Sequence, residues 1–242
     1  MLSITEGTSI SLYLHIPFCI TRCSYCAFYS EAKASWTSSR EQYVDRLEQE
    51  IHELIGKTGP FDTIFMGGGN PGCLTVEQVR RLLSAAKSDQ SREVTIEMNP
   101  ETFDETFFPL FAEGLVTRLS MGIQSMDQQV LQQLGRNATV SDNQKAIALA
   151  NRARSIYGID LSFDLMAALP GQTVEMALKD IDTLTTVSDV EHISLYCLTV
   201  EEGTELAHRI ANKILTVLDE DGQMEMLSVL WKRLEERGYS HY

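Results

Sequence analysis

The chain alternates between short apolar runs and longer segments with apolar residues at helical spacing. Six runs rich in β-branched and other apolar residues have the length of strands: residues 11–16, 61–66, 93–98, 117–123, 159–166 and 192–198. Helical spacing follows them in residues 38–55, 76–86, 103–111, 142–156, 174–186 and 219–237. A strand followed by a helix, repeated along the chain, predicts a parallel sheet with helical crossovers, either a barrel or a doubly wound sheet.

The composition of the strands decides between these two folds, because four of them alternate between apolar and polar residues. In residues 93–98 every second side chain is apolar, and Thr95 and Glu97 lie on the opposite face. The face that helices cover must be apolar, so the polar side chains must point inward, where unpaired charges need water or a ligand. We therefore predict an α/β fold, an open (β/α)6 partial TIM barrel with a polar lumen. A sheet with one face in solvent is the alternative.

The ends of the helices suggest how the chain is divided. Ser39, Thr75 and Asp142 are the predicted helix caps. The last helix carries an apolar stripe and ends at Gly238, a usual terminator; the stripe consists of Met224, Leu227, Leu230 and Leu234. We assign residues 1–218 to the barrel, and residues 219–242 to this helix and the start of a truncated C-terminal region.

Composition and charge exclude several classes of partner. The 242 residues suffice for one barrel domain. Lys and Arg number 20 against 34 Asp and Glu, a formal charge of −14 that repels nucleic acids and anionic membrane surfaces. No stretch approaches the ~18 continuous apolar residues of a membrane span, and the N-terminus lacks a basic start followed by an apolar run. We expect a cytoplasmic protein without an integral membrane segment.

Three of the five cysteines, Cys19, Cys23 and Cys26, lie in the loop that follows the first strand. The functional groups of such barrels collect at the carboxyl ends of the strands, where this loop lies. A cubane iron–sulfur cluster usually takes four thiolates, so three would leave one iron open to a small molecule. A zinc site completed by His15 is the second interpretation, and three unrelated buried cysteines are the third. Cys73 and Cys197 are expected to be ordinary small side chains in a reducing compartment.

The second predicted strand ends in three glycines, Gly67, Gly68 and Gly69, followed by Asn70. Consecutive glycines weaken a strand, so they indicate a place where a backbone or a ligand comes close. A simple tight turn is the alternative.

These motifs resemble those of a known family. The Cys-x3-Cys-x-Tyr-Cys sequence resembles the signature of radical S-adenosylmethionine (SAM) proteins, and His-Ile-Pro-Phe-Cys before it is similar to the oxygen-independent coproporphyrinogen III oxidase group. Further segments look like this group in residues 96–100, 118–125, 134–136, 164–173 and 192–196. The resemblance covers nearly the whole chain and implies a radical SAM core.

The resemblance also implies which residues form the site. Cys19, Cys23 and Cys26 would bind a [4Fe–4S] cluster. SAM would contact Tyr13, Gly68, Gly69, Asn70, Glu97, Gln124, Arg136 and Asp164. Asp164 can accept hydrogen bonds from ribose hydroxyls, and Arg136 can pair with a carboxylate in a bidentate fork. The family more often has Thr where Asn70 stands, and His15 would support the site rather than act as a base.

The group contains haem chaperones and true oxidases, and the residues after the cysteines distinguish them. The oxidases, which decarboxylate propionate side chains in porphyrin biosynthesis, carry a further cysteine two positions after the third ligand, where this chain has Phe28. This favours the chaperone, with haem as cargo and with an electron donor and an unknown haem-acceptor protein as partners. A radical enzyme with another substrate is the third possibility.

The last residues, Tyr239-Ser240-His241-Tyr242, resemble the start of a motif that in the family continues into a C-terminal domain. The His-Asn-x-x-Tyr-Trp motif that the family links with haem lies beyond this point. The five histidines present form no recognisable haem-ligand motif, and a lone histidine is more often structural than a ligand. We therefore expect this chain to hold the cluster and SAM but to bind haem poorly.

Overall fold

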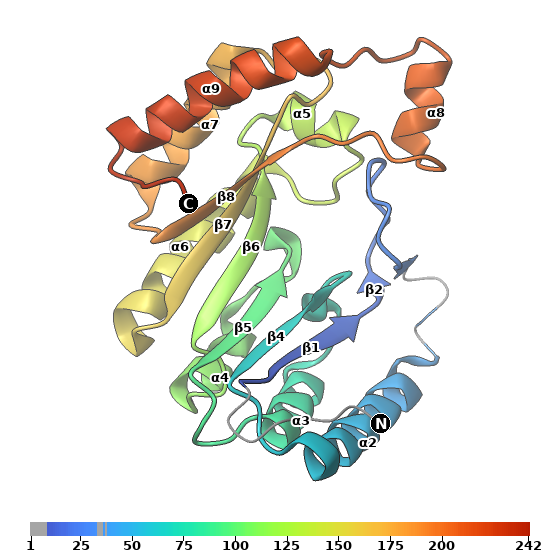
Figure 1. The fold of residues 1–242 in the computed structure, drawn as a ribbon, viewed down its shortest axis with the longest axis vertical. Coiled ribbons are helices and arrows are strands. Elements are labelled where there is room, and N and C mark those ends of the chain that lie inside the picture. Colours follow the sequence, from blue (N-terminus) through green and yellow to red (C-terminus); the bar gives the residue numbers. More distant parts are fainter. Residues whose placement is uncertain (1–8, 33–35, 37) are drawn as a thin grey trace.

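A single parallel sheet organises the molecule. The computed structural model describes residues 9–32, 36 and 38–242. The sheet has the order β1-β4-β5-β6-β7-β8, with every neighbouring pair parallel (Figure 1). Its strands are β1 Ser11–Ile16, β4 Thr63–Gly68, β5 Glu93–Met98, β6 Arg118–Gln124, β7 Asp160–Ala167 and β8 His192–Cys197. In the part of the chain described, β1 and β8 are not paired with each other, so the predicted open barrel is confirmed.

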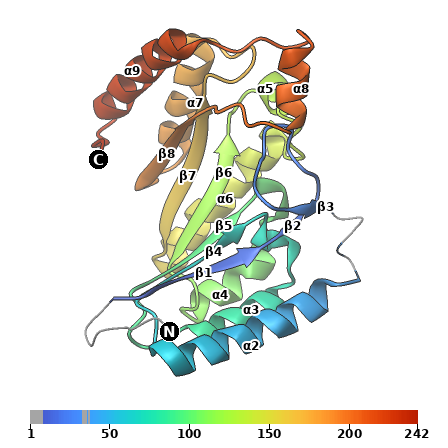
Figure 2. The same ribbon diagram turned by 45° about the vertical axis from the view of Figure 1, so that its right-hand side comes forward.

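Helices cover the outer face of the sheet. They are α2 Arg40–Thr58, α3 Val76–Ala86, α4 Phe108–Ala112, α6 Val140–Tyr157, α7 Val174–Val187 and α9 Glu220–Glu236. Figures 1 and 2 show α2 and α3 side by side near β1 and β4, whereas α7 and α9 lie together beside β7. Two short helices, α5 Gln128–Gln133 and α8 Glu205–Ala211, lie near the carboxyl ends of the strands. None of the described helices is long and apolar enough to cross a membrane.

The two faces of the sheet differ as the alternating pattern predicts. In β1, Leu12 and Leu14 are buried, whereas Tyr13 between them is 56% exposed. In β4, Met66 is buried and Phe65 is 38% exposed. The apolar faces join one continuous core with the helices, which leaves the polar and aromatic face toward the lumen.

The segment predicted as one helix over residues 103–111 is broken in the structure. It contains the 3-10 turn η3 Glu105–Phe107 and the start of the short α4, and a second 3-10 turn, η2 Pro100–Thr102, precedes it. Asp104 ends the extended stretch between the turns, because its carboxylate accepts from the Thr106 backbone N–H at 2.8 Å. Pro109 has no backbone N–H and therefore belongs in the first turn of a helix, where α4 has it.

Two of the three predicted caps also differ from the structure. Thr75 caps α3 in a reciprocal capping box with Gln78, as predicted. The cap of α6 is Thr139, and Asp142 is the third helical residue, whose carboxylate bonds back to the Thr139 N–H at 2.9 Å. Ser39 precedes α2 but makes no side-chain cap bond.

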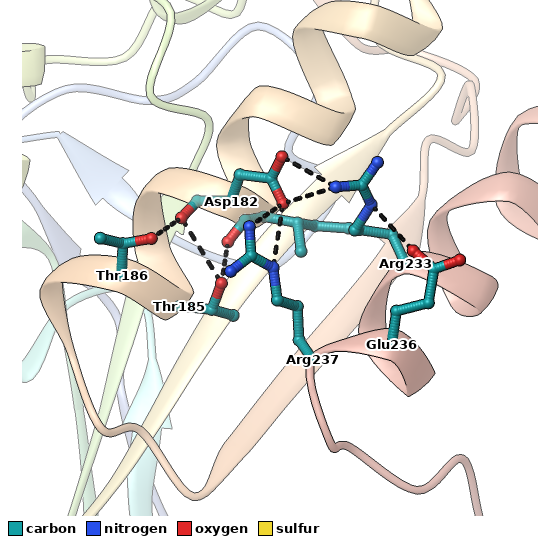
Figure 3. Close-up of polar contacts among 7 residues, drawn as sticks. Asp182, Thr185, Thr186, Arg233, Glu236 and Arg237 are labelled. Atoms are coloured by element: carbon teal, nitrogen blue, oxygen red, sulfur yellow. Dashed lines mark hydrogen bonds and ion pairs between the residues drawn. The ribbon is translucent and has the colours of Figure 1, made fainter.

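The C-terminal helix α9 shares the core of the barrel. Met226, rather than the predicted Met224, joins Leu227, Leu230 and Leu234 in that core, and Met224 is 53% exposed. Figure 3 shows the polar contacts beside this interface: the carboxylate of Asp182 on α7 lies 3.1 Å from Arg233 and 2.8 Å from Arg237 on or after α9. Helix α9 is therefore part of the packing of the barrel. The division of the chain at residue 219 stays a prediction.

Candidate functional site

The cysteine loop leaves β1 at the carboxyl edge of the sheet and is tied to the barrel at several points. A small two-stranded sheet, β2 Phe18–Cys19 and β3 Glu31–Ala32, joins its two ends. The Ser24 backbone N–H donates to the Leu134 carbonyl at 2.9 Å, and the Ser24 carbonyl accepts from the Leu206 N–H of α8 at 2.8 Å. These bonds fix the middle of the loop between α5 and α8, which are far apart in the sequence (Figure 2).

Trp36 holds the first cysteine. Its indole N–H donates to the Cys19 carbonyl at 3.0 Å, and its ring packs on Phe18 with centroids 5.1 Å apart. The side chain is buried, and the Arg40 guanidinium lies 5.5 Å from its ring centroid. Sequence reasoning missed Trp36, because the residue lies between a loop and a helix and belongs to no motif.

Cys19, Cys23 and Cys26 are free thiols, each partly buried. Burial raises the pKa of the Cys19 thiol to about 11 and also raises that of Cys26, so metal loading must displace protons. Among the residues that the structure describes, no group of three His, Cys, Asp or Glu side chains converges on a single-ion site. A cubane cluster does not need such convergence, because it offers separate irons to separate thiolates.

His15 is used within the protein, which argues against the zinc interpretation. One ring nitrogen, Nδ1, lies 3.0 Å from the Tyr13 hydroxyl, and the other, Nε2, lies 3.1 Å from the Tyr29 carbonyl. The carbonyl can only accept, so Nε2 carries the proton and Nδ1 accepts from Tyr13. His15 therefore connects the returning limb of the cysteine loop to β1, which agrees with its expected supporting role.

The three glycines at the end of β4 each make room for a different neighbour. A Cβ at Gly67 would lie 2.5 Å from Glu97 Oε2, and one at Gly68 would lie 2.5 Å from Cε1 of the His15 ring. A Cβ at Gly69 would lie 2.9 Å from the Phe18 carbonyl oxygen and 3.0 Å from Cys19 Sγ. The glycines are therefore required by the approach of the cysteine loop and the lumen side chains, as the sequence suggested.

Two carboxylates face the lumen from neighbouring parts of the sheet. Burial, with a contribution from the charge of Asp164, raises the pKa of Glu97 on β5 to about 7, although the Gly68 N–H donates to this carboxylate at 3.4 Å. Burial also raises the pKa of Asp164 on β7 to about 6, against a hydrogen bond from Ser194. These two groups lie on the inner face, as predicted, and they are available to a ligand that donates hydrogen bonds.

Arg136 and Gln124 meet at the end of β6. Arg136 Nη2 donates to the Gly122 carbonyl at 2.6 Å and lies 3.4 Å from Asn99 Oδ1. Gln124 has a positive φ of 65° at a register shift between Gly122 and Gln124. Gln124 Oε1 and Arg136 Nε are buried without a hydrogen-bond partner. A bound ligand could donate a hydrogen bond to Gln124 Oε1 and accept one from Arg136 Nε.

Asn70 is occupied by its own turn. Its Oδ1 accepts from the Gly72 N–H at 3.0 Å and the Asn99 N–H at 3.3 Å, and its amide nitrogen donates to Thr102 at 3.1 Å. The side chain therefore joins the ends of β4 and β5, so its assignment as a SAM contact stays a prediction. Asn99 was not singled out from the sequence, although it lies within one of the recognised motifs.

The arrangement of three thiols, a glycine-rich strand end and inward carboxylates agrees with the outcome of comparison with known families. The radical SAM superfamily matches residues 13–184. The chain belongs to this superfamily. Membership implies SAM and a [4Fe–4S] cluster as cofactors, and the donor set fits both: three free thiols in one loop, and unpaired polar atoms on Arg136 and Gln124.

Relatives cover nearly all of this chain. Heme chaperone HemW of Bacillus subtilis is 33% identical over 96% of this chain and 62% of its own length. Radical S-adenosyl methionine domain-containing protein 1, mitochondrial, of Danio rerio is 32% identical over 98% of this chain and 54% of its own length. The chain thus spans about three-fifths or less of the relatives it matches.

The structural comparison supports the fold. Coproporphyrinogen III oxidase (HemN) from Escherichia coli, described as a radical SAM enzyme, superposes with a TM-score of 0.80 at 23% identity. The match covers 96% of this chain and 54% of that one. The resemblance that the motifs indicated is therefore confirmed at the level of family and fold.

Proposed function

We propose that this chain is the cluster- and SAM-binding part of a haem chaperone. The observation that carries the proposal is the loop of three free thiols at the carboxyl edge of a barrel with a polar lumen, in a chain 33% identical to a protein named Heme chaperone HemW. The thiols need a reducing compartment, which the cytoplasm provides. An acceptor protein for haem and an electron donor complete the proposed partners.

Each part of the site has a separate task in this proposal. Cys19, Cys23 and Cys26 hold the cluster, which when bound supplies an open iron for SAM and an electron for cleavage of its sulfur–carbon bond. Glu97 and Asp164 accept hydrogen bonds from the SAM nucleoside, and Arg136 Nε and Gln124 Oε1 satisfy its polar groups. The remaining proposed SAM contacts are Tyr13, Gly68, Gly69 and Asn70.

Replacing Asp164 by asparagine is expected to weaken SAM binding about 10- to 100-fold, because hydrogen bonds to a charged group contribute about 1.5–3 kcal/mol. Calorimetry on the cluster-loaded protein measures this directly. Asp160→Asn is the matched control, because Asp160 lies on the same strand but is exposed to solvent. An unchanged SAM affinity combined with a large fall in melting temperature would make Asp164 a structural residue instead.

The raised pKa of Asp164 gives that variant a second, independent signature. The folded chain keeps the Asp164 carboxyl protonated up to its pKa of about 6, whereas the usual pKa of an aspartate is 3.8. Between these two pH values the folded state therefore binds more protons than the unfolded state. The free energy of unfolding therefore falls as the pH rises through this window. Asp164→Asn removes the titration and should flatten that fall, which denaturant unfolding of the cluster-free protein at pH 4.5 and pH 7 would measure.

The haem part of the proposal is tested by titrating haemin and following the Soret band. His15 is hydrogen-bonded through both ring nitrogens, so it is not a free axial ligand. We expect weak, substoichiometric binding by this chain and stoichiometric binding by the full-length Bacillus subtilis relative. Equal, stoichiometric binding by both would place the haem site in the barrel.

Phe28 is the observation that separates this proposal from coproporphyrinogen oxidation. It stands where the oxidases of the family carry a further cysteine, and its side chain is 73% exposed at the cysteine loop. The structural likeness to the oxidase, at 23% identity, concerns the fold. Chromatography for 5′-deoxyadenosine after anaerobic incubation with SAM and a strong reductant would show whether the chain cleaves SAM.

A further inference from the structure

Arg136 is a partly buried residue whose guanidinium has no carboxylate of a described residue in contact with it. Its guanidinium contacts two neutral oxygen atoms, the Gly122 carbonyl at 2.6 Å and Asn99 Oδ1 at 3.4 Å, and its Nε has no partner. None of the ion pairs formed by the described residues includes Arg136. A charge withdrawn from water without an opposite charge is destabilising, so this site favours the binding of an anion.

The anion that the protein itself can place in contact with this guanidinium is a cluster ligand. Arg136 Nη1 points to Cys23 Sγ at 3.9 Å, within reach of a weak N–H···S hydrogen bond. Tyr25, two residues further along the same loop, also interacts with the guanidinium, and Glu101 acts on it from a greater distance. Of the groups in direct contact, the Cys23 thiol becomes an anion when it ligates iron.

The position of Arg136 is fixed from the opposite side. The residue follows α5, whose last turn is hydrogen-bonded to the cysteine loop through the Ser24 N–H and the Leu134 carbonyl. The bond to the Gly122 carbonyl joins the guanidinium to the end of β6. Loop, helix and strand therefore hold the charge beside one cysteine, and the side chain cannot follow a mobile ligand without losing these bonds.

We propose that Arg136 sets the reduction potential of the cluster by donating to the Cys23 thiolate. Reduction adds one electron, supplied by an external donor, to a group bound by three anions. A fixed, partly buried cation at the ligand sulfur stabilises that added charge, since cluster potentials depend on net charge and on hydrogen bonds to the sulfurs. This role goes beyond the proposed SAM contact, because it acts whether or not SAM is bound.

The test measures the potential in the absence of SAM. Arg136→Gln and Arg136→Lys are reconstituted anaerobically, and each is titrated with a reductant while the reduced cluster is followed by electron paramagnetic resonance. We expect Arg136→Gln to take up the electron at least tenfold less favourably, a potential about 59 mV more negative. The potential of Arg136→Lys, which retains the positive charge, should shift much less. Arg209→Gln is the control, because Arg209 donates to the nearby Gln133 carbonyl at 3.1 Å and to none of the thiols.

Each outcome decides the proposal. An unchanged potential in Arg136→Gln overturns it, as does an equal shift in Arg209→Gln. If Arg136→Gln fails to hold a cluster while Arg136→Lys holds one at the original potential, the requirement for charge is supported. Loss of the cluster in both variants would show that shape rather than charge matters, and would overturn it. A shifted potential with unchanged SAM affinity would contradict the SAM contact and leave this proposal standing.

Discussion

Cys23→Ala is expected to abolish cluster binding, whereas Cys73→Ala and Cys197→Ala should leave it intact. Cys23 lies in the loop held between α5 and α8, with its sulfur 3.9 Å from Arg136. Removing one of three thiolates leaves two protein ligands, too few to hold a cubane against loss to solvent. Iron and sulfide per chain after anaerobic reconstitution measure the difference, with Cys19→Ala and Cys26→Ala expected to behave like Cys23→Ala.

The two other cysteines provide internal controls because they lie outside the loop that carries Cys19, Cys23 and Cys26. Cys73 is a buried member of the core next to Leu74, and Cys197 Sγ lies 3.4 Å from Gln223 Oε1 on α9. Alanine at either position removes none of the three thiols of the cysteine loop. Full iron content in Cys23→Ala together with loss in Cys73→Ala would contradict the assignment of the cluster to this loop.

The architecture could be predicted from the sequence because it depends on the local spacing of apolar residues. The two-residue alternation in β5 separates Ile96 from Glu97 whatever the rest of the chain does, and helical spacing separates the outer layer in the same way. This spacing gave a wrong prediction where a backbone constraint overrides it. Pro109 lies in the first turn of α4, so the single helix predicted over residues 103–111 is interrupted. The spacing also failed in α9, where Met224 and Met226 fit the stripe almost equally and packing against α7 and β7 decides.

The sequence predicts which residues form the site better than it predicts which residues they contact. The cysteine spacing and the glycine run are contiguous in sequence, so the sequence displays them directly. The contacts of Trp36 with Cys19 and of Arg136 with Cys23 join residues 17 and 113 positions apart. Such contacts depend on how helices and loops meet at the edge of the sheet, and no spacing rule encodes them. The same holds for Asn70, whose side chain is taken up by its own turn.

Gly68→Ala is expected to lower the free energy of unfolding by about 2–6 kcal/mol and to reduce cluster loading. The residue has a φ of 114°, which side-chain-bearing residues rarely adopt, at a cost of roughly 1–3 kcal/mol. The new Cβ would also lie 2.5 Å from Cε1 of the His15 ring, and overpacking adds about 1–3 kcal/mol. Displacing that ring breaks its bond to the Tyr29 carbonyl, which holds the returning limb of the cysteine loop.

Gly114→Ala separates backbone strain from the contact with His15. Gly114 also has a positive φ, 66°, but a Cβ there would meet nothing within 4 Å. It should therefore lose some stability and keep its full iron content. The double variant His15→Ala with Gly68→Ala then isolates the clash, because the second substitution should cost only backbone strain once the ring is gone. If Gly68→Ala lowers stability equally with and without His15, the ring is not what requires glycine at this position. The link from β4 through His15 to the cysteine loop would then have to be abandoned.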